Sequence, residues 1–185
     1  LTFTINEPLS IIGDVSVEIV GLTKGWYNTQ GSQLNGTAIV ASSSFSGNQM
    51  LSYFSKTQNS GVMKIEDIVF YGNSSKTVNG IMTNAVPSGY YQFPQTTAIV
   101  GNSSTHITSL ELFETGSSTT PSFQNATGVC NANNIYIVGA GNWDIVNNAE
   151  MNIDTIFVGP SGEYGILQAT SGHTNVNTIM LDNMP

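Results

Sequence analysis

The chain has 185 residues, which is enough for one domain with a substantial hydrophobic core. It contains four Lys, no Arg and twelve carboxylates, so its formal net charge is −8. Such a chain offers no basic surface to the phosphates of a nucleic acid, and we expect no nucleic-acid partner. Its apolar runs are only a few residues long, so we also expect no insertion into a membrane.

Uncharged polar residues replace the usual charged surface. Only 9% of the residues are charged, and Asn, Ser, Thr, Gln and Gly occupy most polar positions. This composition is typical of extracellular and virion-surface β proteins. The one cysteine, Cys130, has no partner for an intrachain disulfide, and we expect it to be a small core residue rather than a nucleophile.

Short strands are predicted from the N-terminus onward. They alternate apolar and polar residues and are bounded by Gly, Asn and Ser. The first clear ones are "VSVEIVG" at residues 15–21 and "GTAIV" at residues 36–40. The next, "IEDIVF" at residues 65–70, is followed by a Gly/Ser turn and by "GIM" at residues 80–82. The sequence "TAIV" of residues 37–40 occurs again from Thr97.

The strand at residues 65–70 belongs to a repeat. Its pattern is an apolar residue, two spacers, an apolar residue, one spacer and an apolar residue. The apolar positions of the four copies are Ile65–Ile68–Phe70, Ile107–Leu110–Leu112, Ile153–Ile156–Val158 and Val176–Ile179–Leu181. The copies start 42, 46 and 23 residues apart, which are multiples of about 22. A weaker copy begins at Asn133, and short strands are predicted at residues 128–130, 142–149 and 165–167.

A repeat of this length that holds two or three short strands predicts a solenoid. One such unit cannot bury its own apolar face, but stacked units can, with each strand about 4.8 Å from its counterpart in the next coil. No window shows a sustained apolar period of 3.6 residues, so we expect very little helix. We therefore predict an all-β fold in which residues 1–185 form a single parallel β-helix domain.

Most of the chain resembles the pectate-lyase superfamily of right-handed parallel β-helices. The resemblance rests on Val17–Ile19–Gly21, Gly36–Thr37–Ala38–Ile39, Ile65–Ile68–Phe70–Gly72 and Gly80–Ile81. The superfamily includes bacteriophage tailspikes, polysaccharide lyases and polygalacturonases. The resemblance implies a right-handed helix of roughly seven or eight coils. It concerns the fold and not an active site, and fold alone does not imply function.

The chemistry of the enzymes in that superfamily is not visible in the sequence. Pectate-type lyases use an Arg or Lys beside calcium-binding carboxylates, and this chain has no Arg and no Lys near an Asp cluster. We expect no metal site and no cofactor. A tailspike-type glycosidase would need two carboxylates about 5–9.5 Å apart. The candidates are Glu66, Asp67, Glu111 and Glu114. Solvated surface carboxylates are the alternative interpretation.

Aromatic residues are the candidates for carbohydrate binding. Rings that present one face to solvent can stack on sugars. The candidates are Trp26, Tyr27, Tyr90, Tyr91 and Trp143. Core or loop-anchoring roles are the alternative for aromatic residues in this chain.

A second set of residues is predicted on the outer face of one sheet, because side chains in a strand alternate between its two faces. These residues are Val69, Tyr71, Phe113, Phe157 and Met180. An apolar row on the outside of a solenoid indicates a contact surface. We expect a homotrimer packed around a threefold axis, as in tailspikes, and we expect terminal coils that are covered by a partner or by further chain.

These observations favour a structural or adhesive protein on a virion surface or in another extracellular location. It would be a tailspike-like host-binding module or a capsid decoration (cement) protein, with other virion proteins or a cell-surface glycan as its partner. The alternative is a carbohydrate-active enzyme, namely a tailspike depolymerase or a secreted polysaccharide lyase or hydrolase. A filament subunit that stacks end to end is a third interpretation.

Overall fold

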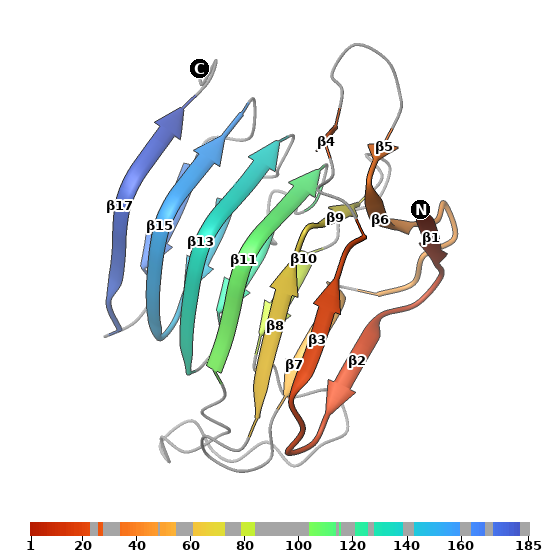
Figure 1. Ribbon diagram of the computed structural model, residues 1–185, viewed down its shortest axis with the longest axis horizontal. Coiled ribbons are helices and arrows are strands. Elements are labelled where there is room, and N and C mark those ends of the chain that lie inside the picture. Colours follow the sequence, from red (N-terminus) through yellow and green to blue (C-terminus); the bar gives the residue numbers. More distant parts are fainter. Residues whose placement is uncertain are drawn as a thin grey trace.

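A computed structural model describes most of the chain. The described residues are 1–22, 26–27, 34–47, 49–54, 61–72, 79–83, 104–113, 115, 121–125, 128–138, 143–159, 164–168 and 172–181. Within them the protein is all-β and contains no helix (Figure 1). This part of the chain accordingly has no helix long and apolar enough to cross a membrane.

Most strands belong to two large sheets. The nine-stranded sheet, called the long sheet below, contains β1 (Thr2–Ile5), β3 (Val17–Val20), β6 (Thr37–Ala41), β8 (Val62–Glu66), β9 (Ile68–Tyr71), β11 (Ser104–Phe113), β13 (Val129–Val138), β15 (Glu150–Val158) and β17 (Thr174–Leu181). The six-stranded sheet contains β2 (Leu9–Ile12), β7 (Gln49–Phe54), β10 (Asn79–Thr83), β12 (Phe123–Asn125), β14 (Trp143–Asn147) and β16 (Tyr164–Gln168). The short strands β4 (Trp26–Tyr27) and β5 (Leu34–Asn35) form an antiparallel pair.

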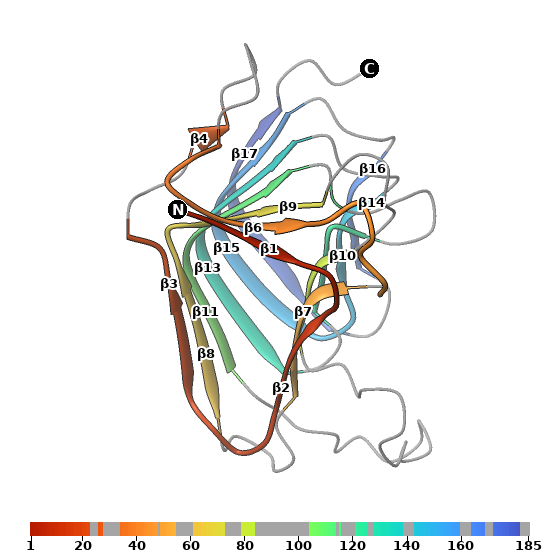
Figure 2. The same cartoon turned by 90° about the vertical axis from the view of Figure 1, so that its right-hand side faces the viewer.

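The chain passes back and forth between the two large sheets. After each of the strands β9, β11, β13 and β15 of the long sheet, it enters the six-stranded sheet and then returns. Every pairing within both sheets is parallel, and each strand pairs with its counterpart one pass later. The two sheets face each other across the core (Figure 2). This all-parallel, stacked arrangement is consistent with a β-helix, and it confirms the all-β prediction.

The apolar positions of the predicted repeat coincide with the register of the long sheet. The spacing of 42 residues from Ile65 to Ile107 is, however, one pass and not two units of about 22, because β8 and β9 pair directly with β11. The weaker copy predicted at Thr97 lies outside the described residues. Ile65 pairs with Ile107, and Ile107 continues through Ala132 to Ile153 and Val176. The other two apolar positions of the repeat form parallel columns in the same way. The weaker copy at Asn133 supplies the missing coil, because β13 lies between β11 and β15.

The core consists of the inward-facing residues of both sheets. Phe70, Leu112 and Ile137 come from the long sheet, whereas Leu51 and Phe123 come from the other sheet, and each is fully buried. Burial of apolar area at about 25 cal/mol per Å² is the main term that holds such coils together. Cys130 lies in this core, as predicted.

The two adjacent spacers of the repeat explain the shape of the long strands. Ile107 and Leu110 are buried, while the intervening Thr108 and Ser109 are both partly exposed. Two consecutive residues can face outward only if the strand bends between them. In the preceding coil this corner separates β8 from β9, and Asp67 adopts a positive φ of 50° there. We call this line of bends the corner.

Candidate functional site

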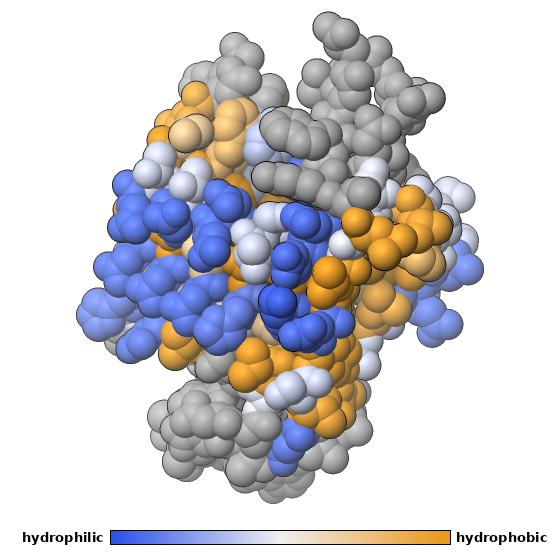
Figure 3. All heavy atoms as spheres, in the orientation of Figure 1, coloured by the Kyte–Doolittle hydropathy of each residue, from blue (hydrophilic) through white to orange (hydrophobic). Residues whose placement is uncertain are grey.

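The outer face of the long sheet carries side chains in straight rows. Residues in register on neighbouring strands lie directly above one another, about 4.8 Å apart. One row runs through Lys64, His106, Asn131, Asn152 and Asn175. Figure 3 shows a hydrophilic band across this face with hydrophobic residues beside it.

Part of that row is a hydrogen-bonded amide ladder, which we call the outer ladder. The Nδ2 atom of Asn152 donates to Oδ1 of Asn131 at 3.1 Å, and Nδ2 of Asn175 donates to Oδ1 of Asn152 at 2.9 Å. At the corner, Nδ2 of Asn177 donates to Oδ1 of Asp154 at 3.0 Å. These bonds link successive coils outside the core.

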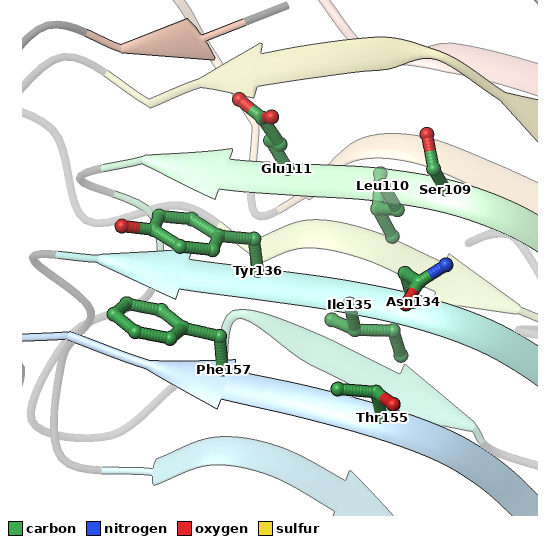
Figure 4. Close-up of a pocket in the computed structure, with 8 residues that line it drawn as sticks. All are labelled: Ser109, Leu110, Glu111, Asn134, Ile135, Tyr136, Thr155 and Phe157. Carbon is green, nitrogen blue, oxygen red and sulfur yellow. The ribbon is translucent and has the colours of Figure 1, made fainter. Parts of the chain in front are cut away.

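Beside the corner lies a groove of about 140 Å³ (Figure 4). Ser109, Asn134 and Thr155 are in register and form one wall. The opposite wall is the next outward-facing row, two residues further along each strand. It consists of Glu111, Tyr136 and Phe157. Leu110 and Ile135 lie between the walls; their side chains are buried in the core, so they contribute main chain to the floor.

The first wall is polar. The Ser109 hydroxyl donates to Oδ1 of Asp67 at 2.6 Å and accepts a bond from the Asp67 amide at 3.3 Å. Ser109 is thereby fixed to the neighbouring coil. The carboxamide of Asn134 is exposed and forms no hydrogen bond to another described residue. Asn134 therefore offers both donors and an acceptor to the groove.

The second wall is mainly aromatic. The rings of Tyr136 and Phe157 are stacked face to face with centroids 4.2 Å apart and an interplanar angle of 1°. Tyr136 also contacts Phe113 at 5.9 Å between centroids. Both rings of the stack are partly exposed. The wall is therefore a fixed apolar surface, with the Glu111 carboxylate next to it.

Among the four candidate catalytic carboxylates, Glu111 lines the groove. Asp67 contacts the groove residue Ser109, as described above. Glu66 forms an ion pair with Lys64 at 3.1 Å. Glu114 lies outside the described residues. No three His, Cys, Asp or Glu side chains in the described part of the chain cluster as metal ligands would.

The predicted interface residues all lie on the outer face of the long sheet, but their exposure differs. Val69 is 1% and Phe113 is 2% exposed, and together with Ala38 they form a small buried cluster outside the main core. Tyr71 and Phe157 are partly exposed, and Met180 is 51% exposed. In this conformation only Tyr71, Phe157 and Met180 can be presented to a partner.

None of the predicted sugar platforms is among the described residues that line the groove. Trp26 and Tyr27 form β4, and Trp143 begins β14 in the six-stranded sheet. Tyr90 and Tyr91 lie outside the described residues. The groove instead uses Tyr136, Asn134 and Thr155, which the sequence analysis did not select. Treating the copy at Asn133 as a full coil would have placed these residues in register with Ser109 and Glu111.

Comparisons with protein-family models, with curated proteins and with solved structures find no match to this chain.

Proposed function

We propose that this chain is a right-handed parallel β-helix that serves as a structural and adhesive module on a virion surface or in another extracellular setting. The all-parallel topology supports the fold assignment, and nearly all parallel crossovers in proteins are right-handed. The tailspike-like host-binding module and the capsid decoration protein are the two forms of this role. Its partners are other virion proteins or a cell-surface glycan.

The make-up of the groove is the observation that carries the adhesive role. Among the described residues that line it, Glu111 is the one carboxylate, beside hydroxyl, carboxamide, aromatic and main-chain groups. Glycoside hydrolysis normally requires two carboxylates that flank the scissile bond. A groove with one carboxylate and abundant hydrogen-bonding groups is better suited to holding a ligand than to cleaving it.

The structural role includes association into a homotrimer. Tyr71 and Met180 leave apolar surface on the outside of a stack whose coils are already paired, whereas Phe157 lines the groove. Exposed apolar rows of this kind mark contact surfaces. Light scattering of the purified protein tests the proposal, with an expected mass of three times 19.7 kDa. A monomer, or open-ended oligomers that grow with concentration, would contradict the trimer.

The alternative function is a carbohydrate-active enzyme, and the position of Glu111 in a groove is the observation that favours it. Incubation with capsular polysaccharide or lipopolysaccharide, followed by an assay for reducing ends, separates the two functions. The adhesive role predicts no release of reducing ends. Release that is abolished by Glu111→Gln would establish the enzyme instead.

A further inference from the structure

The groove beside the corner has a direction. Its two walls each consist of three side chains from β11, β13 and β15 that lie in register. Three strands at the usual spacing extend over about 10 Å along the stack. A ligand that follows the groove therefore runs across the strands. It meets a polar side chain on one side at each coil, and on the other side it meets Glu111 at β11 and an aromatic ring at β13 and at β15.

The groove is small relative to a pocket that encloses a whole ligand. Its volume of about 140 Å³ compares with about 300–1,000 Å³ for pockets that enclose drug-sized molecules. A ligand of that size would have one edge in the groove and the remainder in solvent. This geometry suits a polymer that lies along the surface better than an isolated small molecule.

Because one wall is polar and the other is mainly aromatic, the groove favours a ligand with one polar and one apolar side. Asn134 and Thr155 can donate and accept hydrogen bonds on one side, while Phe157 and Tyr136 offer apolar ring surface on the other. A pyranose ring has both properties, because hydroxyl groups surround its edge and C–H groups cover its faces. A purely apolar ligand would leave the Asn134 carboxamide buried without a partner, which is unfavourable.

The charge of the groove restricts the sugar further. Among the described residues that line it there is no Lys and no His, whereas the Glu111 carboxylate is present. The nearest cation in the rows of this face, Lys64, is already paired with Glu66. A uronate, sulfate or phosphate group would meet the like charge of Glu111, in a protein whose net charge is −8.

From these observations we propose that the groove between the rows Ser109–Asn134–Thr155 and Glu111–Tyr136–Phe157 binds uncharged pyranose units of a polysaccharide and excludes acidic ones. This inference rests on the adhesive role proposed above and names the class of glycan that it concerns. Asn134 and Thr155 hold the hydroxyl groups, the aromatic wall contacts the C–H groups, and the Glu111 carboxylate repels acidic sugars.

Affinity electrophoresis through gels that contain dextran, mannan, galactan or polygalacturonate tests the inference. Retardation by at least one of the three neutral polymers is expected, with none by polygalacturonate. Asn134→Ala should weaken the binding of the retarding polymer by about three- to tenfold, which corresponds to one lost hydrogen bond. Glu111→Gln should lessen the discrimination against polygalacturonate.

Asn152→Ala is the matched control. It removes a carboxamide from the same outer face, on the neighbouring strand and outside the groove. It should bind the neutral polymer as the unchanged protein does. Far-UV circular dichroism of each variant shows whether its fold is retained, and both substitutions are at exposed positions.

Three results would overturn the inference: retardation by none of the four polymers, retardation by polygalacturonate alone, or equal effects of Asn134→Ala and Asn152→Ala. None of them would affect the trimer, which light scattering measures separately. A trimer that binds no neutral polymer would therefore refute the glycan site and leave the structural role standing. A monomer that binds a neutral polymer would refute the trimer and leave the glycan site standing.

Discussion

Two asparagine ladders connect the coils of this protein, and they differ in where they lie. Asn125 and Asn147 form a buried ladder, and both residues are 0% exposed. The outer ladder of Asn131, Asn152 and Asn175 lies on the exposed face of the long sheet. The same carboxamide chemistry is thus found at a turn inside the structure and on a surface in contact with water.

The buried ladder joins each turn to the coil that follows. Asn125 ends β12 and donates through Nδ2 to Oδ1 of Asn147 at 2.9 Å and to the carbonyl of Glu150 at 3.0 Å. Asn147 ends β14 and donates to the carbonyl of His173 at 3.1 Å and to Oγ1 of Thr174 at 2.8 Å. Each amide therefore supplies the main chain of a turn with partners that the sheets cannot offer.

The outer ladder supplies no hydrogen bonds to the main chain of a turn. Its strands are already joined by main-chain pairing, and water can replace each of its side-chain bonds. A buried polar group that loses its partner costs much more than an exposed one. The comparison teaches that the position of an asparagine relative to the turns, and not the presence of a ladder, determines its contribution to stability.

The largest expected effect is that of Asn147→Ala. The substitution removes the bonds to His173 and Thr174. It also removes one of the acceptors of the Asn125 amide and the side-chain partner of the Ala149 main chain. Several lost bonds at about 1 kcal/mol each lower the free energy of unfolding by about 3–4 kcal/mol. Urea denaturation measures this value. A loss below 1 kcal/mol would mean that the buried ladder is no more important than the outer one.

Gly172→Ala should affect the same turn through packing. A Cβ atom at this position would overlap the carbonyl group of Ala149, and that carbonyl accepts a bond from Asn147. The main chain at residue 172 must move away from that at Ala149. Overpacking of this kind lowers the free energy of unfolding by about 2–3 kcal/mol. Denaturation of Gly172→Ala alone and together with Asn147→Ala checks the assignment. Because both changes disturb one turn, their sum should exceed the effect of the double variant.

The inner side of the coils could be predicted from the sequence, because apolar spacing alone determines which residues face the core. Ile65, Ile107 and Ile153 were predicted to share a column, and they do. The two spacers between apolar positions likewise coincide with the corner.

The outer rows and the ladders could not be predicted in the same way. Their composition depends on the register of whole coils, and the coil at Asn133 has a weaker pattern than its neighbours. The burial of Val69 and Phe113 depends on Ala38, which lies 31 residues before Val69 in the sequence. Asn125 and Asn147 look like ordinary turn residues until the coils are stacked.

The dependence of stability on alkaline pH tests whether the Cys130 thiol is buried. Burial raises the pKa of its thiol from an ordinary 9.0 to about 12. Because the folded pKa is the higher one, the unfolded chain releases its proton first. The contribution to stability is complete below pH 9 and is lost between pH 9.0 and about 12. At pH 10.5 the loss amounts to roughly 2 kcal/mol.

Cys130→Ala separates this effect from other alkaline titrations. Burial and the Asp14 carboxylate also raise the pKa of Tyr53, which acts in the same direction and is retained in the variant. The variant should therefore lose stability less steeply between pH 8 and 10.5 in urea titrations at a series of pH values. Identical slopes for the two proteins would show that the thiol is accessible to water.

Substitution of Thr105 is expected to raise the free energy of unfolding, and by a smaller amount than the losses described above. Its side chain is 0% exposed, and its hydroxyl forms no hydrogen bond within the structure. Its register neighbours are Met63 and Cys130, so the site is apolar. Thr105→Val keeps the shape and removes the unsatisfied group, and the free energy of unfolding should rise by about 1 kcal/mol. A decrease would indicate a water molecule bound at the hydroxyl.

The smallest expected effect is that of Asn152→Ala in the outer ladder. This substitution removes the side-chain bonds to both Asn131 and Asn175, yet all three amides remain accessible to water. Solvent satisfies the groups that lose their partner, so the free energy of unfolding should fall by less than about 0.5 kcal/mol. The same urea titration that measures Asn147→Ala gives this value. If Asn152→Ala instead cost several kcal/mol, the outer ladder would be holding the coils together, and the long sheet would rely on its surface amides as much as on its columns of isoleucine and leucine.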